Sequence, residues 1–362
     1  MKILLQNRFD MLKTGKGDRI HFFSLIDALR KKGIKVDYSL NLNPDLSDYD
    51  LVHLFNISRG DTFFQFRNAK LQKKPVVLTP LYNLTIQSKS EGFKNRMKDF
   101  LKKERNLRYL TNLIKFPLSK ERRMAKNLEY DTYFLNKTAQ QLFSEIDMVF
   151  PGSYAELETL LSLYKIKSKC QVVYLGVDDF FFSARGKTFV EKYGVKDFIL
   201  SIVSIMPRKN PVSLIQALKG TKIPVIFVGK LGKDTQYNKK FLSSLTSNMI
   251  YLENLKYEDL VSAYAASRCH VLVSYSETTG LVNLEAGAAG TAIVCSDIPV
   301  HREYFKNYAY YCNPNSTESI RKAVLKAYKD GPLPAVRNFI REKYSWSRCA
   351  EDTINGYLEV LD

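Results

Sequence analysis

The chain has 362 residues, of which 45% are hydrophobic and 25% are charged. This length exceeds one ordinary core and the composition is that of a globular protein, so we expect two domains. No window approaches the roughly 18 consecutive apolar residues of a membrane span, and the apolar run at the N-terminus is too short for a secretory signal. These features exclude an integral membrane protein and predict a cytoplasmic location.

The charge is strongly positive, with 55 Lys and Arg against 37 Asp and Glu, a net +18. Such a surface attracts nucleic acid, anionic lipid or phosphorylated small molecules, and the charge alone does not choose among them. The five cysteines are odd in number, and no two have the spacing of a metal site. We therefore expect buried thiols, no disulfide framework and no bound metal.

Short β-branched and aromatic runs alternate with helical patterns along the chain, which predicts parallel sheets with helical crossovers. Several of these runs are apolar nearly end to end, as in strands that are buried on both faces. The predicted strands of the first half are 2–6, 35–40, 51–56, 76–81, 148–152 and 171–176. Those of the second half are 198–204, 225–229, 249–253, 270–276, 292–297 and 308–312.

The break between the two sets falls near Gly176, Val177 and Asp178. We expect an α/β protein with two doubly wound, Rossmann-like domains, at 1–177 and 178–345. A helix at 346–362 should pack back on the first domain. Two such domains would place ligands at the carboxyl ends of both sheets, in a cleft between them.

One region, 85–130, departs from this alternation and carries thirteen Lys or Arg against five Asp or Glu. Apolar residues recur in it near helical spacing, with a basic polar side. It is either a helix packed on the first domain with an ordinary solvated face, or a surface that binds anionic lipid or an acidic acceptor.

The most informative stretch runs from 270 to 287, where a predicted strand ends, a loop turns and a helix begins near Gly280. Either Thr278 or Thr279 could cap this helix. The free N–H groups and positive dipole end of such a helix form an anion site that suits a diphosphate. Because Gly280 has no Cβ, a ligand can approach its backbone closely.

Two carboxylates flank this helix start. Glu285 lies about one turn inside the helix, where its carboxylate can accept hydrogen bonds from vicinal hydroxyls such as those of a ribose. Glu277 lies at the strand tip, where it could hold the hydroxyls of a second sugar. The pattern predicts a site that binds a nucleotide sugar at three points.

Glu277 and Glu285, eight positions apart with Gly-Leu-Val-Asn between them, resemble the signature of glycosyltransferase family 4. That family contains retaining enzymes of the GT-B fold, with two facing Rossmann-like domains and the donor between them. The segments at 14–19, 50–56 and 76–82 are similar to its first domain. The segments at 173–178 and 344–346 are similar to its domain crossing and to the start of its closing helix.

The resemblance implies a role for individual residues. Lys209, beside Arg208 in the loop after the first strand of the second domain, would contact the donor diphosphate. A cation there would neutralise charge on the departing nucleotide. Glu277 would bind the donor sugar and Glu285 the ribose. The remaining substrate contacts would come from the backbones of Gly280, Leu281, Val282, Asn283, Gly15 and Gly17.

The resemblance further implies a hexosyltransferase that uses a UDP-sugar or GDP-sugar and needs no metal or other cofactor. The acceptor would be a glycan, glycolipid or polysaccharide at the cytoplasmic face of the membrane, with whose anionic surface 85–130 is compatible. The nucleobase would lie near 228–230 and 251–256. His53 ends an apolar strand and is more typical of a satisfied core histidine.

Two departures from the family pattern motivate a second hypothesis. Many members carry an arginine where this chain has Ser204, and a histidine where it has Thr79 and Pro80. The alternative is a non-catalytic GT-B subunit that binds a glycan or partners an active transferase. Epimerases and phosphorylases of this fold are less favoured. Nucleic-acid binding is not expected, because the aromatic residues lack the spacing of an RNA motif.

Overall fold

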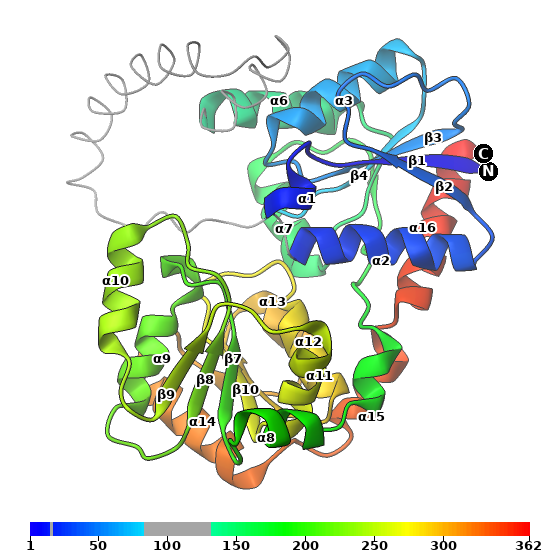
Figure 1. The fold of residues 1–362 in the computed structure, drawn as a ribbon. Coiled ribbons are helices and arrows are strands. Elements are labelled where there is room, and N and C mark those ends of the chain that lie inside the picture. The colour runs from blue at the N-terminus through cyan, green and yellow to red at the C-terminus, as the bar shows by residue number, and fades with distance from the viewer. Residues whose placement is uncertain (15–16, 83–131) are drawn as a thin grey trace, which may run out of the picture. The chain divides into compact units, whose positions relative to one another are not determined.

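A computed structural model describes residues 1–14, 17–82 and 132–362, and the chain divides into two compact units (Figure 1). Unit 1 comprises Met1–Gly152, Glu156–Val173 and Ala350–Asp362. Unit 2 comprises Ser153–Ala155 and Tyr174–Cys349. Gly15 and the whole basic region 85–130 lie outside the described residues, so both remain predictions.

Unit 1 contains a six-stranded sheet in the order β2-β1-β3-β4-β5-β6, with every pair parallel. From β1 the chain first adds β2 on one side and then β3 on the other, so the topological switch of the sheet lies between β1 and β3. The strands are β1 (Lys2–Gln6), β2 (Lys35–Ser39), β3 (Leu51–Phe55), β4 (Val76–Thr79), β5 (Met148–Val149) and β6 (Lys169–Cys170).

The central strand β3 is buried throughout because helices cover both faces of the sheet. Val52 and Leu54 pack into a core with α3, α6 and α7, whereas Phe55 meets Phe22 of α2 edge to face. Among the described residues, the helices of this unit are α1 (Met11–Thr14), α2 (Gly17–Lys31), α3 (Gly60–Leu71), α6 (Thr132–Glu145), most of α7 (Tyr154–Leu163) and most of α16 (Trp346–Leu361).

Unit 2 contains a second parallel six-stranded sheet, in the order β12-β11-β10-β7-β8-β9. Its first and fourth strands, β7 and β10, are neighbours, so the switch point lies between them. The strands are β7 (Ile199–Ile202), β8 (Val225–Val228), β9 (Met249–Leu252), β10 (Cys269–Leu272), β11 (Ala292–Ser296) and β12 (Tyr310–Cys312).

Helices cover both faces of this sheet as well (Figure 1). One apolar core includes α9, α10 and α14, and the other includes α8, α11, α12, α13 and α15. The helices are α8 (Lys187–Tyr193), α9 (Pro211–Leu218), α10 (Thr235–Ser244), α11 (Tyr257–Ala266), α12 (Leu281–Ala288), α13 (Pro299–Phe305), α14 (Thr317–Asp330) and α15 (Val336–Lys343). Two short 3-10 turns are η1 (Asp179–Ser183) and η2 (Pro207–Lys209).

The expected two sets of six strands are confirmed, with differences in detail. The strand predicted at 171–176 is wrong, because β6 ends at Cys170 and is only two residues long. The apolar residues Val173 and Leu175 that suggested a strand are buried in the connection to unit 2 instead. Cys269, Cys295, Cys312 and Cys349 are buried, and Cys170 is half-buried.

Within unit 1, the last turns of α16 lie against β3 and β5. The Tyr357 hydroxyl is 2.6 Å from Nδ1 of His53, and Nε2 of that ring is 2.8 Å from Oγ1 of Thr79. Both nitrogens of this fully buried histidine are therefore occupied, in agreement with a core role. In the part of the chain that the structure describes, no helix is both long and apolar enough to cross a bilayer.

Gly356 gives a direct test of this packing. A Cβ at Gly356 would lie 2.5 Å from Cζ of Phe150 and 3.0 Å from Sδ of Met148. Gly356→Ala should therefore lower the free energy of unfolding by about 1–3 kcal/mol, although alanine is the better helix former. The exposed neighbour Asn355→Ala is the matched control and should be neutral or slightly stabilising in urea unfolding. Equal stability of the two variants would contradict the packing described.

Candidate functional site

The candidate site occupies the switch point of unit 2, at the carboxyl ends of β7 and β10. Ligands of open parallel sheets bind there because neighbouring chain connections diverge and leave room. The loop that follows β7 contains η2, and the loop that follows β10 leads into α12. The two loops are joined by the Tyr275 amide, which donates to the Arg208 carbonyl at 2.9 Å.

The η2 loop is fixed by its own sequence. Pro207 starts the turn with a suitable φ, and Asn210 ends it in the left-handed region at φ 58°. The buried Asn210 amide donates to the Val273 carbonyl at 3.3 Å and to the Pro314 carbonyl at 2.9 Å. These bonds hold Arg208 and Lys209 against the end of β10.

Lys209 and Glu277 form a direct ion pair, with Nζ 2.5 Å from Oε1. Only 18% of the lysine side chain and 5% of the glutamate side chain are exposed. Arg208 donates to the Ser276 carbonyl and places Nη1 3.8 Å from Oε2 of Glu277. Two cations therefore share one carboxylate, so the cluster carries a net charge of +1.

Burial would raise the pKa of Glu277, but the charges of Lys209 and Arg208 outweigh it and leave that pKa below its ordinary value. Glu277 is therefore ionised at neutral pH. Burial lowers the pKa of Lys209, and Glu277 opposes this shift. An anion that entered here would meet a partly desolvated ammonium and guanidinium, where charge interactions are stronger than in water.

Gly280 begins α12 in the left-handed region, at φ 78° and ψ 50°. A Cβ there would also lie 3.0 Å from Nε2 of His301, so both the backbone and the available space require glycine. No side chain caps the helix, so the expected cap by Thr278 or Thr279 is wrong. Thr279 is buried and interacts with the Tyr304 hydroxyl instead.

The first turn of α12 presents the amides of Leu281 and Val282, which have no partner within the helix by its geometry. The Asn283 amide differs, since it donates to the Gly280 carbonyl at 2.8 Å. Its side-chain oxygen is 2.9 Å from Nδ1 of the buried His270, whose Nε2 accepts from the Ile202 amide at 3.2 Å. Asn283 therefore joins α12 to β7 and β10 and, in this structure, offers no free backbone amide.

Glu285 lies in the second turn of α12 and is only 7% exposed. The hydroxyl of the buried Tyr264 donates to its Oε2 at 2.6 Å. Burial raises the pKa of Glu285 to about 7, the Tyr264 hydroxyl opposes the shift, and the negative charge of Asp178 adds to it. The two predicted carboxylates thus have opposite electrostatic environments.

Sequence reasoning missed the residues that hold the predicted ones in place. They are Tyr264 beside Glu285, Asn210 behind η2, and His270 beside Asn283. Tyr264 precedes Glu285 by 21 residues, and Asn210 lies 63 residues from Val273. No local pattern in the sequence signals such pairs.

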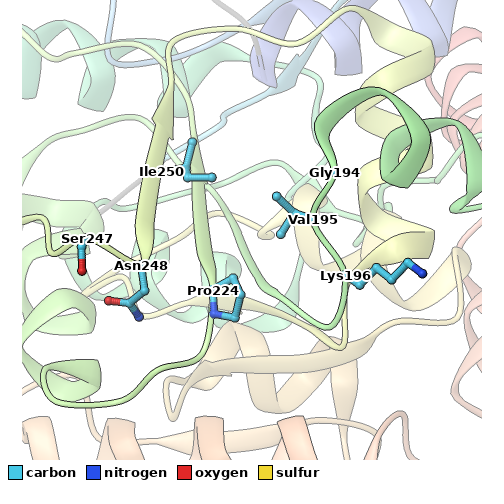
Figure 2. Close-up of a pocket in the computed structure, with 7 residues that line it drawn as sticks. All are labelled: Gly194, Val195, Lys196, Pro224, Ser247, Asn248 and Ile250. Atoms are coloured by element: carbon cyan, nitrogen blue, oxygen red, sulfur yellow. The ribbon is translucent and has the colours of Figure 1, made fainter.

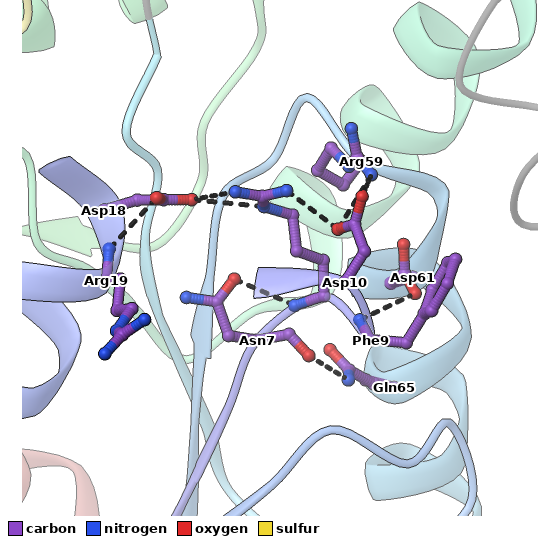
Figure 3. A network of polar contacts seen from close by, with 9 residues as sticks. Asn7, Phe9, Asp10, Asp18, Arg19, Arg59, Asp61 and Gln65 are labelled. Carbon is purple, nitrogen blue, oxygen red and sulfur yellow. Dashed lines mark hydrogen bonds and ion pairs between the residues drawn. The ribbon is translucent and has the colours of Figure 1, made fainter. Parts of the chain in front are cut away.

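The switch point of unit 1, between β1 and β3, carries a second polar network (Figure 3). Arg8 donates to Oδ2 of Asp18 at 2.7 and 3.1 Å and to Oδ1 of Asp10 at 2.7 Å. Arg59 reaches the same Asp10 at 3.3 Å. Sequence reasoning also missed this network, although it lies beside the predicted glycine loop.

Of the two glycines predicted in that loop, only Gly17 is described, at the start of α2. A Cβ there would meet nothing within 4 Å, so packing does not require glycine and the surrounding space is open. Ser204, one of the two departures from the family pattern, is exposed after β7. Thr79, at the other departure, is hydrogen-bonded to His53.

A hollow of about 390 Å³ lies at the opposite edge of the unit 2 sheet, before the amino ends of β8 and β9 (Figure 2). Lys196 is the one charged residue among those that line it, and no aromatic side chain or carboxylate joins it. The switch point therefore remains the candidate site. Among residues 1–14, 17–82 and 132–362, no group of three His, Cys, Asp or Glu is positioned to hold a metal ion.

The pKa of Glu285 has a measurable consequence for stability. The folded chain holds this proton up to about pH 7 and the unfolded chain up to about 4.5, so rising pH destabilises the fold across that interval. The free energy of unfolding of Glu285→Gln should equal that of the wild type below pH 4.5 and exceed it by up to about 3 kcal/mol near pH 8.

Urea unfolding of both proteins, followed by fluorescence of Trp346 in unit 2, measures this difference. Glu253→Gln, at an exposed position of the same unit, is the control and should leave the pH profile unchanged. An identical profile for Glu285→Gln and the wild type would contradict the raised pKa.

Comparisons with known proteins find relatives of this chain among glycosyltransferases. Residues 187–346, which contain Lys209, Glu277 and Glu285, match the family model of glycosyl transferases group 1. Escherichia coli O-antigen chain mannosyltransferase B is 29% identical over 46% of this chain and 48% of its own length. The E. coli serotype-specific mannosyltransferase WbdA is 26% identical over 68% of this chain and 32% of its own length. The chain therefore spans half or less of the length of these two relatives.

A processive diacylglycerol alpha-glucosyltransferase of Acholeplasma laidlawii is 23% identical over 100% of this chain and 99% of that protein. Among solved structures, sucrose-phosphate synthase from Thermosynechococcus elongatus has a TM-score of 0.72 at 13% identity, covering 99% of both chains. HepE from Anabaena, solved with UDP and glucose, has a TM-score of 0.71 at 13% identity, again covering 99% of both. The chain therefore has the GT-B fold, and residues 187–346 of its second unit are similar to the glycosyl transferases group 1 family.

Proposed function

We propose that this chain is a retaining hexosyltransferase that moves a sugar from a UDP-sugar or GDP-sugar to a hydroxyl of an acceptor. The observation that carries the proposal is the buried Lys209–Glu277 pair beside the first turn of α12. Lys209, Arg208 and the amides of Leu281 and Val282 would bind the diphosphate. HepE, whose structure contains UDP and glucose, supports a nucleotide-sugar donor.

In the reaction, the bond between the anomeric carbon and the β-phosphate oxygen breaks, and the electron pair leaves with the nucleoside diphosphate. The acceptor oxygen forms the new bond to that carbon, and its proton is lost to the leaving phosphate or to solvent. Negative charge grows on the β-phosphate as the bond breaks. Lys209 and Arg208 would stabilise this charge more strongly in the transition state than in the bound donor.

The two glutamates would bind different parts of the donor. Glu277 is ionised, and its Oε2 lies 3.8 Å from Nη1 of Arg208, so this oxygen could accept from hydroxyls of the transferred sugar. Glu285 would accept from the ribose hydroxyls once it is ionised. We propose that the two protein cations take the place of a divalent ion and that no further cofactor takes part.

We further propose that the acceptor is a glycan, glycolipid or polysaccharide at the cytoplasmic face of the membrane. The names of the relatives, an O-antigen chain mannosyltransferase and a diacylglycerol glucosyltransferase, support a polysaccharide or lipid acceptor. The carboxylates and guanidinium groups at the switch point of unit 1 are suitable partners for sugar hydroxyls. The net charge of +18 suits an anionic membrane surface.

Donor binding can be measured without knowledge of the acceptor. UDP or GDP should raise the melting temperature, since a ligand at a hundredfold excess over Kd stabilises by about 2.7 kcal/mol. Lys209→Ala and Glu285→Ala should each weaken nucleotide affinity at least tenfold, because each loses a charge-assisted hydrogen bond. Each shift is compared with the same variant without ligand.

Lys240→Ala, which removes an exposed lysine of α10, is the matched control and should keep the full response. No shift with any nucleoside diphosphate, or an equal shift in the Lys209 variant and the wild type, would contradict the proposed donor site.

Turnover separates an enzyme from a non-catalytic GT-B subunit. The wild type should release sugar slowly from its donor in water, and Glu277→Gln should reduce the rate roughly a hundredfold because it removes the ionised partner of Lys209. Release of nucleoside diphosphate measures both rates. Nucleotide binding with no release from any UDP-sugar or GDP-sugar, with or without acceptor, would favour the subunit.

A further inference from the structure

Unit 2 has a second cavity, of about 210 Å³, whose lining residues come from several elements. Helix α13 and the residue after it contribute Glu303 and Lys306, and α15 contributes Phe339 and Lys343. The remaining lining residues are Tyr174, Tyr344 and Arg348. None of them belongs to the proposed donor site.

Three cations surround this cavity, and among the described residues none of the three has a carboxylate partner. Lys306 places Nζ 5.9 Å from the centre of the Phe339 ring. Arg348 reaches only the Glu342 carbonyl, at 3.5 Å. Lys343 is exposed. Their charges are therefore available to a ligand.

The one carboxylate of the cavity is fully engaged. Oε1 of Glu303 accepts from the Tyr154 amide and the Tyr174 hydroxyl, both at 2.7 Å, and Oε2 accepts from the Ala155 amide at 2.9 Å. Glu303 is therefore tied to the backbone amides of Tyr154 and Ala155, which also belong to unit 2, and none of the three cations pairs with it. The cavity keeps a net positive charge of about +2.

The walls are rigid aromatic rings. Tyr344 stacks on Tyr304 at 5.0 Å and meets Tyr174 and Phe339 edge to face at 5.7 and 5.8 Å. Lys306 has φ 44°, a backbone conformation that is strained for a residue with a Cβ. Its carbonyl accepts from the Tyr311 hydroxyl at 2.6 Å, which helps to hold that conformation.

The size and charge of the cavity select a class of ligand. Its volume lies below the roughly 300–1,000 Å³ of pockets for drug-sized ligands, so a whole nucleotide would not fit. An arginine fork and two lysine point charges suit the oxygens of a phosphate. We propose that this cavity binds the phosphate group of a phosphate ester, with the rings against the adjoining carbon atoms.

The test uses the full chain with Lys209→Ala, so that phosphate binding at the donor site is weakened. Inorganic phosphate and glycerol 3-phosphate are titrated by calorimetry and by fluorescence of Trp346, the single tryptophan, which lies between Tyr344 and Arg348 in the sequence. Adding Lys343→Gln and Arg348→Gln should weaken binding of both at least tenfold. Adding Lys322→Gln and Lys329→Gln, which remove two exposed lysines of α14, should not.

A second arm identifies the source of the phosphate. Binding to vesicles of phosphatidylcholine is compared with binding to vesicles that also contain phosphatidylglycerol. If Lys343→Gln and Arg348→Gln reduce only the vesicle binding, the ligand is a lipid headgroup; if they reduce only the titrations, it is a free phosphate ester. Affinities that are equal in the cavity variant and the α14 control, in both arms, would overturn the proposal.

The otherwise unmodified cavity variant should keep the wild-type response to UDP or GDP, which shows that it is folded. This result also separates the two proposals. Loss of the nucleotide response in Lys209→Ala with intact phosphate binding would support both sites. Absence of any nucleotide response in the wild type would remove the donor site and leave the phosphate cavity standing.

Discussion

The candidate site depends on the ion pair between Lys209 and Glu277, buried where β7 and β10 diverge. Burying two charges costs several kcal/mol each, and their attraction offsets this cost only when the geometry is good. Here the geometry is imposed by the η2 loop, which Asn210 ties to the end of β10. The pair therefore occupies the position where a parallel sheet leaves room for a ligand, with its charge only partly neutralised.

The two glutamates illustrate how surroundings separate chemically identical groups. Both are buried, but the neighbouring cations of Glu277 lower its pKa, whereas Glu285 has only the Tyr264 hydroxyl to oppose burial, which raises its pKa to about 7. Glu277 is thus a permanent anion, and Glu285 can take up or release a proton near neutral pH. Burial favours the neutral acid in both cases, and the neighbouring charge decides which form prevails.

Much of this could be predicted from the sequence, because the signals are local. Apolar runs gave twelve strands in two sets, and only the strand at 171–176 was misplaced. The spacing of Glu277, Gly280 and Glu285 predicted the start of α12. This signal is local, because a glycine can adopt the left-handed conformation without a partner far away in the sequence. The predicted threonine cap of that helix was wrong, because the Thr279 side chain hydrogen-bonds to Tyr304 of α13 instead. The local sequence does not show this partner.

The partners of the site could not be predicted for the same reason. Tyr264 reaches Glu285 and His270 reaches Asn283 from separate elements that the fold brings together. Arg8 joins Asp10 to Asp18, which are near it in sequence, but no spacing pattern marks these residues as partners. These contacts determine the pKa values and orientations of side chains that the sequence had already indicated as site residues. The sequence therefore indicated which residues form the site, and the fold determines their charge states.

An experimental structure of the chain with UDP or GDP bound would show directly whether the Lys209–Glu277 pair binds the donor. A terminal phosphate oxygen should lie within hydrogen-bond distance of Nζ of Lys209, and the diphosphate should lie against the amides of Leu281 and Val282. A nucleotide bound in the hollow before β8 and β9, or a diphosphate with no contact to Lys209, would contradict this role of the pair.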